Sequence, residues 1–188
     1  MEGSVLFNIP DYRTARHIHS GVSTEQSIHT RSEYGTYAFS NVIFMNLFDI
    51  YDSAIYLFTL KSHASLSHCS FVSCGCQSNP GAVYVVCLSH YIDDLCFAQC
   101  YSESVIHVMK FFSSLHPSKL PVIQHITTTL SPLQENYFGE LFQLRAFRSK
   151  IRDLNFSKSN SRGRECLCVQ ETTSEYGAQY VSFVDLGL

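Results

Sequence analysis

The chain has 188 residues, enough for one domain and too few for two of full size. Charged residues make up only 15% of it, against about 25% in an average soluble protein, while hydrophobic residues reach 45%, which excludes a disordered or highly charged binding protein. The net charge of −3 creates no overall field that attracts nucleic acid, so we expect no nucleic-acid partner.

Residues 1–37 contain no clear repeat and are predicted to form a degenerate N-terminal coil or a cap. No signal peptide is visible in this chain, because the first residues lack a basic segment and Pro10 interrupts them before an apolar stretch develops. The apolar segment 38–60 is long enough to span a bilayer, but Asp49 and Asp52 would each cost about 2.5 to 3.5 kcal/mol at its centre. We therefore expect no transmembrane segment.

Residues 38–188 carry a repeat whose most regular position is a phenylalanine. The gap of 59 residues between Phe97 and Phe156 fits two repeats if Thr128 occupies the missing position. An apolar residue recurs two positions before each anchor, and a second apolar alternation follows it, as at 54–57 and 82–85. The anchors are separated by 27, 26, 59 and 27 residues: Phe44, Phe71, Phe97, Phe156 and Phe183.

Two alternating segments joined by a polar bend, repeated every 26–31 residues, predict one coil of a parallel β-solenoid. Equivalent residues of successive coils then lie about 4.8 Å apart, so the phenylalanines form a buried ladder. We predict an all-β fold, a parallel β-helix of about five or six coils.

The stretches 69–74 (CSFVSC) and 80–85 (PGAVYV) resemble the repeats of right-handed parallel β-helix proteins of the pectin-lyase-like superfamily. They are most similar to the Phe-x-x-Cys and Gly-Gly-Ala-Ile pattern of polymorphic-membrane-protein-type repeats, with Pro80 in place of the first glycine. The resemblance covers residues 40–110 well and 150–188 less closely. It implies a right-handed helix and, if the chain is a fragment, a place in a larger surface or secreted protein.

Two segments interrupt the repeat. Residues 116–121 contain two prolines and are predicted to form a loop. After Ser131, a Ser-Pro-Leu-Gln start is typical of a helix N-terminus. Either an inserted or capping α-helix over 132–148 or a degenerate fourth coil explains this segment. The apolar stripe behind the helix prediction has gaps of 3, 3, 4 and 3: Leu141, Leu144, Phe147, Ile151 and Leu154.

Eight cysteines and nine histidines supply metal-ligand types, but no Cys-x-x-Cys pair occurs, so we predict neither a metal site nor a cofactor. We expect Cys69 and Cys74 to face the coil interior, as Leu95 and Cys100 do one coil later. Cys74 and Cys100 would stack about 4.8 Å apart, a separation that permits a disulfide without giving the side-chain orientation it needs.

A polar column lies three residues before the anchors, starting at Asn41. Because strand alternation turns it away from the phenylalanines, we predict an exposed row with neighbours about 4.8 Å apart. Such a row allows hydrogen bonds between imidazoles and carboxylates, or joint contact with a sugar or a metal ion; the alternative is an ordinary solvated face. Its candidate site residues are His68, Asp94, His125 and Asp153.

Seven of the 13 basic residues lie between positions 145 and 164, where Asp153 is the only acid. This basic patch would suit an acidic polysaccharide, an anionic membrane or an acidic protein face, and the alternative is a solvated surface that aids solubility. Its members are Arg145, Arg148, Lys150, Arg152, Lys158, Arg162 and Arg164.

Local catalytic motifs such as Gly-x-Ser-x-Gly, a Walker loop and His-Glu-x-x-His are absent from the sequence, and no catalytic residue is assigned. We predict a non-catalytic scaffold or adhesion module that contacts a protein or a glycan surface and whose open ends self-associate. The alternative is a carbohydrate-active β-helix enzyme, a polysaccharide lyase or hydrolase, or a degenerate relative of one.

Overall fold

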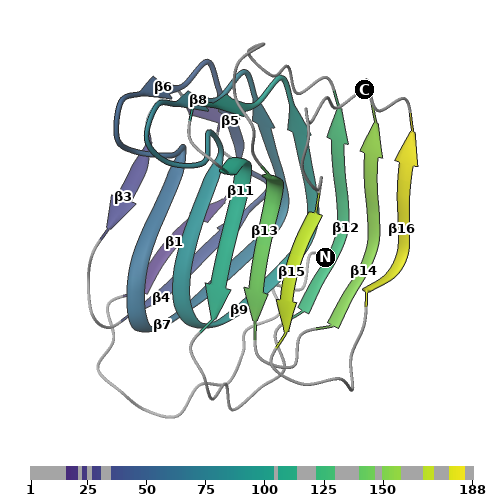
Figure 1. Ribbon diagram of the computed structural model, residues 1–188. Helices are drawn as coiled ribbons and strands as arrows, with labels where there is room; N and C mark the ends of the chain where they lie inside the picture. The colour runs from purple at the N-terminus through teal and green to yellow at the C-terminus, as the bar shows by residue number, and fades with distance from the viewer. Residues whose placement is uncertain are drawn as a thin grey trace.

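The structure is a computed structural model, and it describes residues 16–20, 23–24, 27–30, 35–103, 106–113, 122–129, 140–146, 150–157, 167–171 and 178–184. Within these residues the chain forms β-strands and no α-helix, and successive coils pair in parallel (Figure 1). This confirms the predicted all-β parallel solenoid. No helix in this part of the chain is both long and apolar enough to cross a membrane.

The strands stack in three rows, which we call rows I, II and III. Two strands, β7 (Ile55–Val72) and β9 (Val83–Ala98), are long because each runs through row I and continues into row II. The rest of row I is β3 (Ile28–Thr30), β11 (Ile106–Ser113), β13 (Glu140–Ala146) and β15 (Leu167–Glu171).

Row II contains the later parts of β7 and β9 together with seven shorter strands. Figure 1 shows three of them, β12, β14 and β16, side by side in one layer, with β11, β13 and β15 of row I in another. The seven are β1 (Arg16–Ser20), β2 (Ser23–Thr24), β4 (Thr36–Ser40), β5 (Ile43–Met45), β12 (Val122–Thr129), β14 (Lys150–Ser157) and β16 (Ala178–Val184).

Row III is short and pairs β6 (Phe48–Asp49), β8 (Gly75–Cys76) and β10 (Tyr101–Ser102). Because all three rows meet only here among the described residues, the solenoid has about three complete turns. The prediction of five or six coils is therefore corrected. The phenylalanine repeat counts the strands of row II, and the described part of row II has more strands than the described part of row III.

Row II bends in five successive coils because one residue in each adopts a left-handed backbone conformation. In a regular strand, every second residue faces the core. The bend adds one residue, so the inward residues on its two sides are three positions apart, as the buried Leu66 and Cys69 are. Values of φ between 52° and 55° occur at Asn41, His68, Asp94, His125 and Asp153. A second bend after the anchor, at Asn46, Ser73 and Gln99, leads the chain into row III.

The first three rings of the predicted phenylalanine ladder lie in the core. Strand register pairs Phe44 with Phe71, Phe71 with Phe97, and Phe97 with Thr128, as the repeat alignment requires. The first three rings are fully buried, and each neighbouring pair stacks with centroids 5.0 Å apart. Beyond Thr128, the register continues through Phe156 to Phe183.

Beyond Phe97, a phenylalanine of row I, two strands further along that row, reaches into the core. Phe142 of β13 is fully buried and packs edge-on against Phe97, with centroids 5.5 Å apart and ring planes at 82°. A small residue at position 128 is thus compatible with a dense core.

The helix predicted over 132–148 is wrong for 140–146, where β13 pairs with β11 and β15. Residues 132–139 and 147–148, like the predicted loop at 116–121, lie outside the described residues. Ile151 and Leu154 are both buried, on the two sides of the bend at Asp153. Their spacing of three comes from the bend, which imitates the periodicity of a helix.

The turn into row I depends on a glycine. A Cβ atom at Gly81 would lie 1.9 Å from the backbone carbonyl oxygen of Tyr101 in the next coil. Because backbone atoms cannot move aside at that distance, position 81 requires glycine. The glycine of the PGAVYV stretch therefore serves the close approach of two coils.

Candidate functional site

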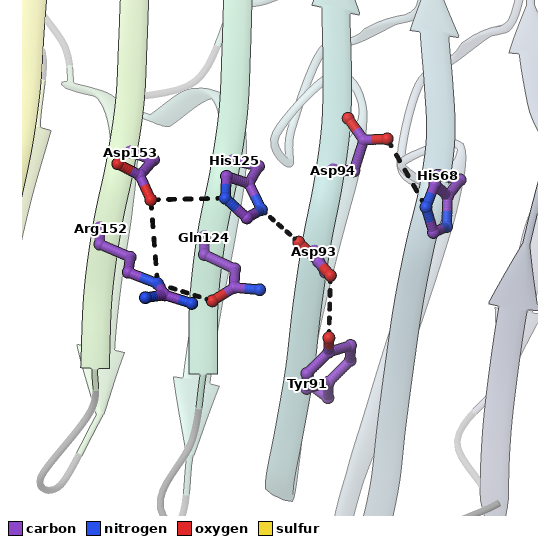
Figure 2. Close-up of polar contacts among 8 residues, drawn as sticks. All are labelled: His68, Tyr91, Asp93, Asp94, Gln124, His125, Arg152 and Asp153. Atoms are coloured by element: carbon purple, nitrogen blue, oxygen red, sulfur yellow. Dashed lines mark hydrogen bonds and ion pairs between the residues drawn. The ribbon is translucent and has the colours of Figure 1, made fainter. Parts of the chain in front are cut away.

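The row of His68, Asp94, His125 and Asp153, which we call the polar row, lies on the outside of the solenoid at the bend of row II (Figure 2). The residues come from β7, β9, β12 and β14, and strand register on both sides of the bend places them in consecutive coils. Their side chains are 58%, 60%, 49% and 39% exposed in that order.

The backbone explains why these residue types stand in this row. Asparagine, aspartate and histidine are the non-glycine residues most enriched at positive φ, because their side chains tolerate the left-handed conformation better than branched ones. The column consists of these three types from Asn41 to Asp153. It faces outward in phase with the strand alternation from His68 to Phe71, as predicted, and the bend shifts the alternation only on its other side.

Contacts along the polar row join neighbours in two separate pairs. His68 Nε2 lies 3.8 Å from Asp94 Oδ2, and His125 Nε2 lies 3.4 Å from Asp153 Oδ2. Between the two pairs, His125 turns to the adjacent residue Asp93, with Nδ1 2.7 Å from its Oδ1. The continuous alternating line expected from the sequence is therefore divided in the middle.

Asp93 belongs to a second outward column, one residue before the bend, which the sequence analysis missed. Strand register places Asp93, Gln124 and Arg152 side by side. The Tyr91 hydroxyl donates to Asp93 Oδ2 at 2.8 Å, and Arg152 Nε donates to Gln124 Oε1 at 2.8 Å. The spacing of one residue from the polar row is the signal that would have revealed this column.

These two columns join into a network that spans three coils, as Figure 2 shows. Arg152 Nε also lies 3.8 Å from Asp153 Oδ2, which closes the network on the β14 side. We call this set the polar network; it consists of Tyr91, Asp93, Gln124, His125, Arg152 and Asp153.

Electrostatics favour the ionised form of Asp93. Partial burial raises the pKa of Asp93, but hydrogen bonds from His125, Tyr91 and Gln124 outweigh it and lower the pKa below its ordinary value. Burial, reinforced by the hydrogen bond to Asp93, raises the pKa of Tyr91 and keeps its phenol protonated. The centre of the network is therefore a carboxylate held by several donors.

The chemistry available at this face is hydrogen bonding in both directions. Asp94 and His68 touch each other only at 3.8 Å and are more than half exposed, so most of their polar atoms meet solvent. No group of three or more His, Cys, Asp or Glu side chains suited to a metal ion occurs within the described ranges.

The basic patch is described only in part. Arg145 lies on β13 in row I, whereas Lys150 and Arg152 lie on β14 in row II. Arg152 is engaged in the polar network. Arg148, Lys158, Arg162 and Arg164 lie outside the described residues.

The cysteines that the sequence placed inside are buried, free thiols: Cys69, Cys74 and Cys100. Burial raises the pKa of Cys69 to about 11. A hydrogen bond from the Cys100 thiol lowers the pKa of Cys74, whereas burial raises that of Cys100. These thiols pack as small apolar groups in the core.

A second outward group, on row I, was also missed by the sequence analysis. His29 stacks on Tyr56 with centroids 4.7 Å apart, and Tyr56 stacks on Tyr84 at 4.8 Å. Lys110 Nζ lies 5.4 Å from the Tyr84 centroid, and His29 Nδ1 lies 2.7 Å from Asp52 Oδ2. Because the ring faces cover one another, this stack offers mainly ring edges and hydroxyl groups to a ligand.

Comparison with protein-family models, with curated proteins and with solved structures finds no match for this chain. The argument for a function therefore depends on the geometry of the described residues.

Proposed function

We propose that the chain is a non-catalytic solenoid module that holds a partner at the polar network. We further propose that it is a right-handed β-helix related to the pectin-lyase-like superfamily, with repeats of the polymorphic-membrane-protein type, and works within a larger surface or secreted protein. The CSFVSC stretch supports this relation, because its Cys69, Phe71 and Cys74 are all buried in one coil around the second bend.

The observation that carries the proposal is the connected order of the polar network. Its side chains come from β9, β12 and β14 and fix one another through hydrogen bonds and ion pairs. Side chains already held in one arrangement lose little conformational entropy when a ligand binds. A rigid solenoid with such a face is suited to binding.

A hydroxyl-rich glycan is the first partner class to test. Carboxylate, amide, imidazole and guanidinium groups lie within a few residues of each other here, so the face can both donate to and accept from sugar hydroxyls. A polar protein surface is the second class, because the same groups suit a peptide backbone.

The test compares binding of a neutral and acidic glycan panel by the wild-type protein and by His125→Asn. Asparagine stands at the same bend in Asn41, so this change removes the imidazole without straining the backbone. We expect affinity to fall about tenfold or more, since lost hydrogen bonds to charged groups cost about 1.5 to 3 kcal/mol.

A matched control is Glu103→Gln, which removes a carboxylate just after β10, next to row III. It should bind as the wild type does. Binding that His125→Asn leaves unchanged, or no binding to any glycan or extracellular protein tested, would overturn the proposal.

One observation favours an enzyme as the second candidate. Asp93 holds Nδ1 of His125 so that Nε2 faces Asp153, the arrangement of a general base oriented by a carboxylate. Release of reducing ends or unsaturated sugars from the same panel, abolished by Asp153→Asn, would replace the binding module with a carbohydrate-active enzyme.

A further inference from the structure

One histidine lies in the core of the solenoid. His90 of β9 faces inward, is 4% exposed and packs against Phe111 of β11 with ring centroids 5.5 Å apart. Neither Nδ1 nor Nε2 has a hydrogen-bond partner among the residues that the structure describes. A buried polar group without a partner is costly, and a buried charge without one is costlier still.

The described elements packed around His90 supply no opposite charge. Register places Ala64 of β7 beside His90, and Tyr37 of β4 beside Ala64. The inward neighbours on β9 are Ile92 and Cys87, and burial raises the pKa of Cys87 to about 12, so its thiol is neutral. The inward residues of β12 are Ile123, Ile126 and Thr128, none of them titratable.

The nearest charged residues on the same strands point away. Asp93 and Lys110 follow the outward phase of β9 and β11, where Asp93 contacts His125 and Lys110 lies over Tyr84. A proton on His90 would therefore remain without a counter-charge among the described residues.

Burial accordingly lowers the pKa of His90 to about 4 from an ordinary value of 6.5. Between these two values the unfolded chain binds a proton that the folded chain does not. The contribution of His90 to the free energy of unfolding is therefore unchanged by pH above about 6.5, and it becomes unfavourable as the pH drops toward 4. This pH dependence of stability is opposite to that of an exposed histidine beside an aspartate, which gains an ion pair on protonation.

We propose that His90 makes the solenoid acid-sensitive: as the pH falls from neutral to about 5, the coil around β9 loses stability and opens. Because β9 also carries Tyr91 and Asp93, opening would disperse the polar network on its outer side. The inference is independent of what that network binds.

The experiment measures denaturant unfolding of the full chain at about pH 7, 6 and 5. His90 alone should raise the unfolding constant of the wild type roughly 20-fold between pH 7 and pH 5. His90→Leu and His90→Gln, one apolar and one polar, should each lose that part of the pH dependence. His68→Asn, which removes an exposed histidine at a bend, should keep it.

A second measurement covers the case in which the variants fold poorly. In the wild type, the NMR signals of the His90 ring should stay in the neutral form down to about pH 5. Ring signals that titrate near pH 6.5, or an equal pH dependence of unfolding in wild type and both His90 variants, would overturn the proposal.

Discussion

Two columns of residues run along the same bend of row II, three positions apart, and they follow different rules. The inner column consists of Phe44, Phe71 and Phe97, which are fully buried and stacked, so volume and packing determine which residues occupy it. The outer column, from Asn41 to Asp153, faces outward and has positive φ, so backbone conformation is the first factor that determines its residue types. A polar repeat in a solenoid is therefore weaker evidence for binding than contacts between its side chains.

The largest expected effect is in the inner column. Phe71→Ala should destabilise the protein by about 3 to 5 kcal/mol, because stiff neighbouring coils cannot collapse into the cavity. Urea unfolding measures this loss. Phe48→Ala is the control, since that ring is 54% exposed and should cost less than about 1 kcal/mol. Equal losses at the two positions would show that the ladder is not the core.

A second change tests whether the ladder can be completed. Sequence alone suggests that Thr128→Phe restores the missing ring, but Phe142, from the coil after Thr128, already packs edge-on against Phe97. We expect overpacking to cost about 1 to 3 kcal/mol.

Adding Phe142→Ala should recover part of that loss, because the two positions share one space. The same unfolding assay measures the coupling. A Thr128→Phe protein that is more stable than the wild type would show that the core has room to spare there.

Much of the register could be read from the sequence because a stacked ladder repeats one residue type at one spacing. The alignment placed Thr128 between Phe97 and Phe156, as the strands do. The helix over 132–148 failed for 140–146 because a bend residue separates inward positions by three, as at Ile151 and Leu154, and so imitates helical spacing.

The site could be predicted only in part. Position in the repeat predicts the polar row. Whether His125 contacts Asp94 or Asp93 depends on how its ring is oriented, and the ring is turned toward Asp93. Tyr91 and Gln124 were missed because their roles depend on side-chain contacts. Gln124 contacts Asp93 and Arg152 across coils, and Tyr91 contacts Asp93 along its own strand.

In the outer column, backbone conformation should matter more than charge. Asp94 has φ of 53°, so Asp94→Val places a branched residue in the left-handed region and should cost about 1 to 2 kcal/mol. Asp94→Gly removes the same carboxylate but tolerates that conformation. Thermal unfolding should therefore rank glycine above valine. The reverse order would mean that the bend does not select the residues of this row.

The smallest expected effect comes from charge alone. Asp94→Asn keeps a residue type that occupies the same bend at Asn41 and removes only the carboxylate contact with His68, which is an ion pair when the imidazole is protonated. The two atoms are 3.8 Å apart, and both side chains are more than half exposed. Exposed pairs contribute about 0 to 1 kcal/mol and are screened by salt. The unfolding midpoint should shift little, and the shift should shrink further in high salt. A larger loss that persists in high salt would mean that this carboxylate is tied into the fold by contacts other than the ion pair, and the outer column would then follow the same packing rule as the inner one.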